Sequence, residues 1–346
     1  MDKSIITITG ATGYIASWIV HDLLKTGHEV RITVRNKSQV EKYQHLLDIE
    51  KESEGKLVVY EADLLKEGSF DEAVSGADYV MHTASPFLLD DKNDPQKNLV
   101  DPAVNGTKNV LGAVNRSGSV KRVVLTSSLA AIYGDNKDMV DQGLSTLDET
   151  IWNTTSTINN GAYSYSKTEA EKAAWAMMKE QKDWSLVTIH PGFVLGPSLT
   201  KRIDSTSINT VLRILHGEIS IGSPDLAFIF SDVRDISKGH ILAAFTEKAN
   251  GRYIIANESG NLLTLGKIIG AAYGDTYKVP KRLVPKWLVW LIAPTIGFTR
   301  LYVKNNIGYP ISCDNSKSKK ELGMTYHMLK ETIIDHVEQL KNDELI

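Results

Sequence analysis

Tyr163 and Lys167 are four residues apart, so their side chains could share one face of a helix. A tyrosine with an ordinary pKa of about 10 holds its proton too tightly for easy exchange at neutral pH. A nearby ammonium group stabilises the phenolate and lowers that pKa, so the pair could form a proton donor. The same spacing also arises by chance on solvated helix faces, so it needs support from other motifs. Tyr165 is only two residues from Lys167 and would not face it.

A glycine-rich turn near the start of the chain provides the first support. Residues 4–9 form a short apolar, β-branched segment typical of a buried strand, and residues 17–25 carry a helical pattern. Gly10 and Gly13 lie between them, in the context that a dinucleotide-binding turn requires. Gly10 would permit the tight turn, Gly13 would let the backbone approach a pyrophosphate, and the following helix N-terminus would attract it. An ordinary turn is the alternative.

Strand and helix patterns alternate as far as about residue 197. Strands are expected at 28–34, 56–61, 78–82, 120–126 and 185–190, with helices at 102–115 and 166–182. This order predicts an α/β fold with a Rossmann-type doubly wound parallel sheet, whose ligands gather at the carboxyl ends of the strands. We assign residues 1–197 to this dinucleotide-binding domain and expect residues of about 232–256 to return to it. Residues 198–346 should form mainly a smaller substrate-binding lobe.

The composition excludes several classes of protein. The chain has 346 residues, 42% of them hydrophobic, and a net charge of −3, which does not suggest a nucleic-acid partner. Its one cysteine, Cys313, cannot form an internal disulfide and suits a reducing compartment. No His, Cys and carboxylate cluster has metal-site spacing, so we expect no metal. The polar start leads directly into the first strand, and we expect a cytoplasmic protein.

The most apolar segment covers residues 283–298 and contains Trp287 and Trp290. It is interrupted by Pro285, Lys286 and Pro294 and is too short to cross a bilayer. We therefore expect no membrane partner and interpret the segment as a packed helix of the second lobe. A wall of the substrate pocket and a peripheral membrane contact are the alternatives.

Further motifs lie at the strand ends. In chain order the motifs are Thr9-Gly-Ala-Thr-Gly-Tyr-Ile-Ala16, Asp63-Leu64, His82-Thr-Ala-Ser-Pro86, Leu125-Thr-Ser-Ser128, Tyr163-x3-Lys167, Pro191-Gly-Phe-Val-Leu-Gly-Pro197 and Asp232-Val-Arg-Asp235. In these motifs and their order, nearly the whole chain resembles the extended short-chain dehydrogenase/reductases. It looks most like the branch of dihydroflavonol reductases, cinnamoyl-CoA reductases and yeast-type aldehyde or methylglyoxal reductases. The resemblance implies an NADPH-dependent reductase that converts an aldehyde or ketone to an alcohol.

The resemblance also implies catalytic roles. Tyr163 would give its proton to the substrate oxygen, and Lys167 would depress the tyrosine pKa and contact the nicotinamide ribose. Ser128 would hydrogen-bond the same oxygen, because the family's catalytic serine is the second of the Ser127-Ser128 pair. Capping of the strand end is the alternative role for these serines.

Cofactor choice depends on the end of the second strand. Enzymes specific for NAD carry a carboxylate near this position, whereas this chain has Arg35, which can grip a 2′-phosphate. Lys37 or Lys42 would supply a second cation, although either could be a solvated charge. Asp63 resembles an adenine contact but could instead be a turn residue. The expected cofactor-binding residues are Gly10, Thr12, Gly13, Tyr14, Ile15, Arg35, Lys37, Lys42, Asp63, Leu64, Thr83, Ala84, Ser85, Tyr163, Lys167, Pro191 and Val194.

The substrate side is less defined. By resemblance, Phe87, Ser128 and Tyr133 should contact the substrate, with help from residues 200–230. Tyr133 stands where flavonoid-reducing relatives carry asparagine, which favours an apolar aldehyde or ketone over a flavonoid. Phe87 and Tyr133 could also be ordinary core residues. His82 and His190 lie at strand ends and are interpreted as packed or hydrogen-bonded side chains.

Two other functions stay open at this point. A nucleotide-sugar epimerase or dehydratase uses the same Tyr/Lys pair but retains bound NAD, and Arg35 and Phe87 argue against it. A non-catalytic dinucleotide-sensing regulator could also have this fold, although such relatives lose the Tyr, Lys and Ser set. Monomer and homodimer are both compatible with the sequence.

Overall fold

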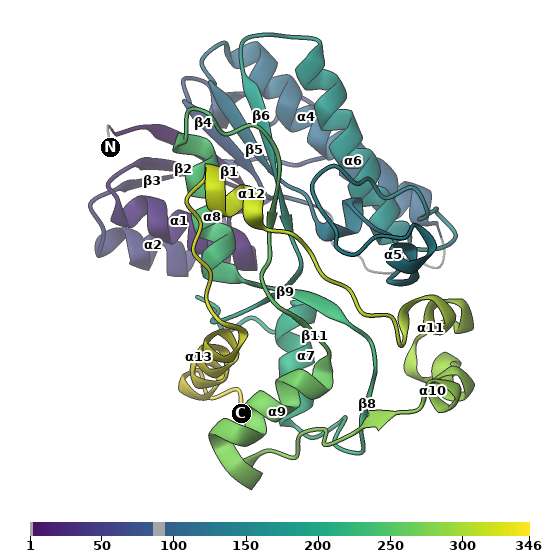
Figure 1. The fold of residues 1–346 in the computed structure, drawn as a ribbon. Helices are drawn as coiled ribbons and strands as arrows, with labels where there is room; N and C mark the ends of the chain where they lie inside the picture. Colours follow the sequence, from purple (N-terminus) through teal and green to yellow (C-terminus); the bar gives the residue numbers. More distant parts are fainter. Residues whose placement is uncertain (1–2, 86–93) are drawn as a thin grey trace.

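A seven-stranded parallel sheet forms the upper half of the molecule in Figure 1. The computed structural model describes residues 3–85 and 94–346. The strands are β1 (Ile5–Thr9), β2 (Glu29–Val34), β3 (Lys56–Glu61), β4 (Tyr79–His82), β5 (Arg122–Thr126), β6 (Ser185–Pro191) and β10 (Gly251–Ile255). Their order is β10-β6-β5-β4-β1-β2-β3, and every neighbouring pair is parallel. This is the predicted Rossmann-type doubly wound sheet, with its switch point between β1 and β4.

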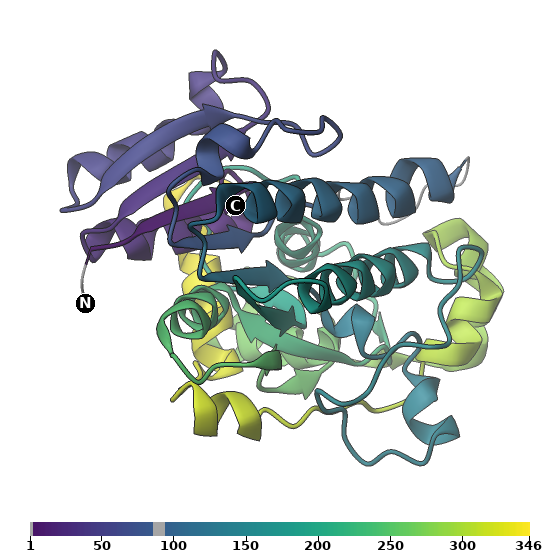
Figure 2. The same cartoon turned by 90° about the horizontal axis from the view of Figure 1, so that it is seen from above.

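Helices cover both faces of this sheet. One face carries α1 (Tyr14–Lys25), α2 (Gln44–Lys51) and α8 (Val233–Phe245), and the other carries α3 (Asp71–Val74), α4 (Asp101–Ser117) and α6 (Ala162–Lys179). In Figure 2, α4 and α6 run side by side across one face of the sheet. Because both faces are covered, even polar strand residues such as Thr7, Thr9 and Thr188 are buried.

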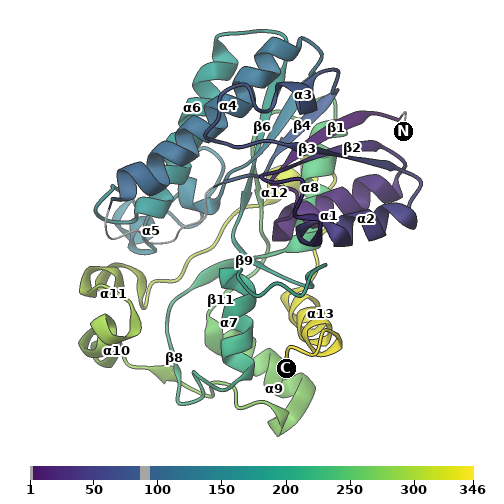
Figure 3. The ribbon, with the colours of Figure 1, turned by 180° about the vertical axis from the view of Figure 1, so that it is seen from behind.

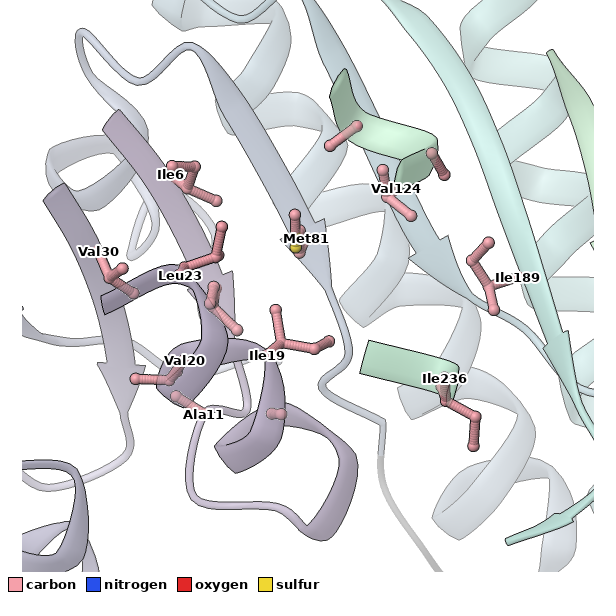
Figure 4. Close-up of a cluster of buried hydrophobic side chains, with 14 of the residues drawn as sticks. Ile6, Ala11, Ile19, Val20, Leu23, Val30, Met81, Val124, Ile189 and Ile236 are labelled. Carbon is pink, nitrogen blue, oxygen red and sulfur yellow. The ribbon is translucent and has the colours of Figure 1, made fainter. Parts of the chain in front are cut away.

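The larger core lies between the sheet and the α1/α8 pair. Ile19 and Leu23 of α1, Ile236 of α8, and Ile6 and Met81 of the sheet belong to this core, and all five side chains are fully buried (Figure 4). Burial of each such side chain stabilises the fold by about 1.5–3 kcal/mol relative to exposure. This packing fixes α1 against β1, and so fixes the glycine-rich turn between them.

The rest of the chain forms a smaller lobe below the sheet (Figure 3). It contains a sheet of order β11-β9-β7, made of β7 (Phe193–Leu195), β9 (Phe228–Asp232) and β11 (Ser259–Gly260), and the pair β8 (Ser223–Pro224) and β12 (Leu283–Val284). Its helices are α7 (Thr206–Leu215), α9 (Leu262–Tyr273), α10 (Lys286–Ile292), α11 (Arg300–Asn306) and α13 (Leu329–Asn342). Apolar side chains of α7, α9 and α13 share one core.

Short segments connect these elements. They are η1 (Val40–Lys42), η2 (Gln96–Val100), η3 (Leu129–Ala131), α5 (Lys137–Asp141), η4 (Gly274–Thr276), η5 (Ala293–Ile296) and α12 (Ser316–Glu321). After β9 the chain returns through α8 to β10, which pairs with β6 at the edge of the large sheet. Arg122 of β5 secures this return, since its guanidinium donates to the carbonyl of Ala243 at 2.9 Å and to that of Glu247 at 2.8 Å.

Two expectations about helices need correction. The helix expected at 166–182 begins earlier, at Ala162, after Gly161 in the left-handed conformation (φ 80°). Residues 283–298 were expected to form a packed helix, and this is wrong. They form β12, α10 and η5, and within α10 and η5 only Val289 and Ala293 are buried. No helix in the described ranges is long and apolar enough to cross a membrane.

Candidate active site

Tyr163 and Lys167 lie in the first two turns of α6 and point toward the same space. The Lys167 Nζ atom is 6.0 Å from the centre of the Tyr163 ring. Both residues line a cavity of about 340 Å³, together with Ser128, Pro191 and Val194. Tyr165 does not line this cavity, as its spacing predicted. The turn that begins at Gly161 places Tyr163 inside the helix, so the predicted i, i+4 relation exists.

The acid–base properties of the pair differ from the prediction. Burial raises the pKa of the Tyr163 phenol above its ordinary value, and a hydrogen bond with Ser128 opposes this rise. The sequence predicted a lowered pKa for this phenol, but desolvation is the larger effect and the pKa is raised overall. Burial also lowers the pKa of Lys167 to about 8. Tyr163 therefore keeps its proton at neutral pH, as a general acid must.

The two neighbouring serines have different partners. The Ser127 hydroxyl donates to the buried Glu171 carboxylate at 2.6 Å. Ser128 hydrogen-bonds the Tyr163 phenol, and its Oγ also accepts the N–H of Ala130 at 3.1 Å. Ser128 thus caps η3, the alternative considered for it, while also facing the phenol. The geometry supports Ser128 as the serine that could hold a substrate oxygen.

Sequence analysis did not identify Glu171, which lies one helical turn after Lys167 and is 1% exposed. Its carboxylate accepts from the Arg252 Nε atom at 2.8 Å, and the His190 Nε2 atom lies 2.8 Å from Glu171 Oε2. Burial raises the Glu171 pKa, but the charges and hydrogen bonds of His190, Arg252 and Ser127 outweigh it and hold the pKa well below its usual range. The signal in the sequence was the repeated four-residue spacing from Tyr163 through Lys167 to Glu171.

The two histidines at strand ends are hydrogen-bonded, which confirms that interpretation. His82 Nδ1 lies 2.7 Å from Thr9 Oγ1, and burial is the main reason that its pKa falls to about 3. His190 belongs to the Glu171 network. Among the residues that the structure describes, no group of three or more His, Cys, Asp or Glu side chains could hold a metal ion.

A second cavity of about 1230 Å³ adjoins the first and reaches the end of β2. The two cavities share Gly10, Thr12, Gly13, Thr83 and Ser85 among their lining residues. Together they form a continuous path from Tyr163 past the glycine-rich turn. Its lining suits a dinucleotide, with one end at Tyr163 and the other at Arg35.

The glycine-rich turn fits a pyrophosphate. Gly10 has a φ of +67°, and a Cβ atom there would lie 2.8 Å from the Ala84 Cα atom, so no side chain is tolerated. Gly13 is the N-cap residue of α1 and has no capping side chain, and no acidic residue lies in the first turn of that helix. The first N–H groups of α1 can therefore bind an anion. Tyr14 and Ile15 line the smaller cavity, and the Tyr14 hydroxyl donates to the Gly196 carbonyl.

The two lysines proposed to assist Arg35 at the end of β2 have different surroundings. Arg35 and Lys42 line the larger cavity, whereas Lys37 does not. The backbone N–H of Lys37 donates to the carboxylate of Glu61 at 2.9 Å. Arg35 and Lys42 could thus form a two-cation cradle for a 2′-phosphate.

Asp63 and Leu64 have separate surroundings. Leu64 lines the larger cavity together with Thr83, Ala84 and Ser85, as expected. Asp63 is not among the lining residues, and its Oδ1 atom accepts the N–H of Leu65 at 2.8 Å. That is an Asx turn, the alternative that the sequence left open.

The expected substrate residues have different outcomes. Phe87 lies outside the described residues. Tyr133 lines neither cavity and packs against an apolar cluster that includes Leu129, Ile132 and Met139. Burial raises its pKa well above 10. The structure therefore places Tyr133 with the core residues, the alternative role considered for it.

Sequence reasoning also missed Arg202, which reaches the site from the smaller lobe. Arg202 lines both cavities, and its Nη1 atom donates to the Thr12 carbonyl at 3.3 Å across the glycine-rich turn. Its Nε atom donates to Asp204 at 3.1 Å. The available signal was a basic pair, Lys201 and Arg202, soon after the Pro191–Pro197 motif.

The fold and this site define a class of protein. Residues 6–256 match the model of the NAD dependent epimerase/dehydratase family, and the chain belongs to that family. Several relatives that match most of this chain are reductases. The cinnamoyl-CoA reductase CAD2 of Medicago truncatula is 36% identical over 341 residues, which cover 98% of this chain and 96% of that protein. The tetraketide α-pyrone reductase 1 of Arabidopsis thaliana is 38% identical over 282 residues, 81% of this chain and 84% of that protein.

Solved structures agree with this grouping. The yeast methylglyoxal/isovaleraldehyde reductase Gre2, solved in complex with NADPH, superposes with a TM-score of 0.79 and 29% identity. The match covers 99% of this chain and 100% of that one. The protein is therefore grouped with the reductases of the family, and the predicted resemblance is confirmed.

Proposed function

We propose that this protein is an NADPH-dependent reductase that converts the carbonyl group of an aldehyde or ketone into an alcohol. The observation that carries the proposal is the Tyr163 phenol. It is kept protonated by burial, hydrogen-bonded to Ser128, and lies at one end of a cavity suited to a dinucleotide. The carbonyl-reducing relatives support the same reaction class.

The residues of this chain can divide the reaction between them. The bound dinucleotide would supply a hydride to the carbonyl carbon. Tyr163 would donate its phenolic proton to the carbonyl oxygen, and Ser128 would hydrogen-bond that oxygen as negative charge develops on it. Lys167, within the same cavity, would orient the nicotinamide ribose and favour the phenolate left after transfer.

The proposed preference for NADPH rests on the far end of the larger cavity. Arg35 and Lys42 present two positive charges there, and a 2′-phosphate is the part of NADPH that NADH lacks. The structure of Gre2 with NADPH supports this choice. We also propose a cytoplasmic location, supported by the single cysteine, which cannot form an internal disulfide and suits a reducing compartment.

Replacement of the proposed acid tests the reaction. In Tyr163→Phe the ring remains while the proton is lost, so we expect kcat to fall by at least about 10²-fold with NADPH affinity changed less than about threefold. The measurements are NADPH oxidation across aldehydes, diketones, flavonoids and acyl-CoA thioesters, and NADPH binding by fluorescence. Tyr165→Phe is the matched control and should retain wild-type kcat. Equal turnover by Tyr163→Phe would refute the assignment.

The same experiment separates the alternatives. A protein that is purified with tightly bound NAD and oxidises no NADPH with any carbonyl would instead be an epimerase or dehydratase. A protein that binds NADPH without turnover would support the regulator, although such a protein has no need for the Tyr163, Lys167 and Ser128 arrangement.

A further inference from the structure

The surface formed by residues 278–304, called here the α10–α11 surface, exposes an unusual number of apolar side chains. Within the described ranges thirteen large hydrophobic residues are exposed, and seven of them lie between residues 283 and 301. These seven are Leu283, Trp287, Trp290, Leu291, Ile292, Ile296 and Leu301. Trp287 is 68% exposed and Trp290 43%. Scattered exposed apolar residues need no explanation, but a cluster of this kind marks an interaction surface.

The charge of the same segment has one sign. Residues 276–313 contain six cations and neither Asp nor Glu. The cations are Lys278, Lys281, Arg282, Lys286, Arg300 and Lys304, and all six are exposed. Since the whole chain has a net charge of −3, the remaining residues carry −9. The segment therefore has a positive net charge and an apolar surface, whereas the rest of the protein has a negative net charge.

The structure holds this segment in a defined shape. Lys286 Nζ donates to the carbonyls of Lys304 at 3.0 Å and Ile307 at 2.7 Å, which ties α10 to α11. The Arg300 guanidinium lies 4.3 Å from the centre of the Trp290 ring. In Figures 1 and 3, α10 and α11 lie at the outer edge of the smaller lobe, away from the large sheet. The apolar side chains are thus presented outward by a folded unit with its own small core.

Acidic side chains near this unit neutralise its charge only in part. Asp275 lies 3.4 Å from Lys281, where both side chains are largely exposed. Asp135 accepts from the side-chain amides of Asn305 at 2.8 Å and Asn306 at 2.6 Å. The positive charge of the surface is therefore available to an external partner.

We propose that the α10–α11 surface docks on an anionic lipid bilayer, with α10 lying in the headgroup plane. Tryptophan and cations beside apolar side chains are the combination that interfacial helices use, and each cation near such a surface adds to the attraction. A second copy fits less well, because a two-fold interface would bring six cations against six cations. The proposal departs from the expectation of no membrane partner and is independent of the proposed reaction.

Vesicle binding by the full-length protein tests the proposal. Vesicles of phosphatidylcholine alone are compared with vesicles that also contain roughly 30% phosphatidylglycerol, by co-sedimentation and tryptophan fluorescence. We expect binding to the anionic vesicles, at least tenfold weaker binding to the neutral ones, and loss of binding as salt rises from about 0.1 to 0.5 M.

Matched variants locate the contact. Trp287→Ser/Trp290→Ser should lower the partition coefficient on anionic vesicles by at least about tenfold, because apolar area drives insertion. Lys304→Gln should lower it roughly fivefold, the effect of one cation. Leu65→Ser, which removes an apolar side chain that is 64% exposed on the other lobe, should bind like the wild type. All variants should keep the wild-type melting temperature, because the replaced side chains are exposed.

Three results would overturn the proposal: no sedimentation with anionic vesicles, equal binding to neutral vesicles, or unchanged binding by the double tryptophan variant. Light scattering is measured in parallel. A wild-type dimer that becomes monomeric in Trp287→Ser/Trp290→Ser, without any vesicle binding, would make this surface an interface between copies instead.

Discussion

Ser127 and Ser128 show how two chemically identical neighbours acquire different roles. Extended backbone places successive side chains on opposite sides. Ser127 donates to the buried Glu171, whereas Ser128 hydrogen-bonds the Tyr163 phenol. Of the two, Ser128 is the one that contacts the proposed acid, and its hydroxyl could donate a hydrogen bond to a substrate oxygen. The roles follow from what each hydroxyl contacts.

Cofactor preference is a prediction about Arg35. In Arg35→Asp a charge-assisted contact with the 2′-phosphate is lost and repulsion is added, so we expect NADPH affinity to fall about 10²-fold. NADH affinity should change less than about threefold, because NADH lacks that phosphate. Binding constants for both dinucleotides are measured by fluorescence titration. An equal loss for the two would refute the phosphate role.

The two lysines provide a matched comparison. Lys42→Ala should weaken NADPH binding about tenfold, the effect of one charge-assisted hydrogen bond, because Lys42 lines the larger cavity. Lys37→Ala should leave it unchanged, because Lys37 does not line that cavity. The reverse pattern would assign the second cation to Lys37.

The lowered pKa of Lys167 gives a pH dependence. As pH rises through about 8 the buried ammonium loses its proton, so its attraction for the cofactor and for a phenolate disappears. We expect kcat/KM for NADPH, which reports groups of the free enzyme, to fall above about pH 8. Lys167→Arg should have a lower rate but no such fall, since arginine stays charged. An identical profile for both proteins would contradict the role of Lys167.

At the level of elements, α6 organises the site. Tyr163, Lys167 and Glu171 follow one another at four-residue intervals on one side of this helix. Two of them line the cavity, and Glu171 joins α6 to β6 through His190 and to β10 through Arg252. The helix that carries the proposed acid is therefore tied to the strand whose last residue, Pro191, lines the same cavity.

Loss of the Glu171 charge should destabilise the protein. In Glu171→Gln the Arg252 guanidinium, whose side chain is 7% exposed, is left without a counter-charge, and breaking such a buried pair costs about 3–5 kcal/mol. The free energy of unfolding is measured by urea denaturation. Glu169→Gln removes an exposed partner of Lys172 on the same helix and should cost less than about 1 kcal/mol. If both variants lowered the free energy of unfolding by similar amounts, the Glu171 network would make no special contribution to stability.

At the level of the whole molecule, the site needs both lobes. Arg202 crosses from the smaller lobe to the Thr12 carbonyl, and Trp18 of α1 donates to the Pro197 carbonyl at 2.8 Å. Arg234, near the start of α8, forms ion pairs with Asp232 at the end of β9 and with Asp335 of α13. These ion pairs join α8 to the smaller lobe. These contacts fix the substrate side of the cavity relative to the glycine-rich turn.

The smaller lobe depends on its own core. Ile333 of α13 is fully buried among apolar residues of α7 and α9, so Ile333→Ala should lower the free energy of unfolding by about 2–5 kcal/mol. Leu65→Ala, at a position that is 64% exposed, should change it by less than about 0.5 kcal/mol. Urea unfolding followed by circular dichroism distinguishes them. A small effect at Ile333 would mean that α13 is not part of the stabilising core.

The sequence by itself determined the sheet, the glycine-rich turn and the Tyr163/Lys167 pair. These depend on local patterns: β-branched runs between helices, glycine where φ is positive, and two residues four apart on a helix. Each of these features depends on the types and spacing of a few neighbouring residues. It could therefore be recognised without knowing which other segments pack against it.

Only the tertiary structure decided the remaining features. Burial set the direction of the Tyr163 pKa, opposite to the prediction, because desolvation depends on every element around the phenol. Glu171 meets Arg252 across 81 positions of sequence, and Arg202 meets Thr12 across 190. Packing also left Trp287 exposed instead of buried in the smaller lobe. Such contacts and exposures exist only once distant segments are brought together, so no local pattern could reveal them.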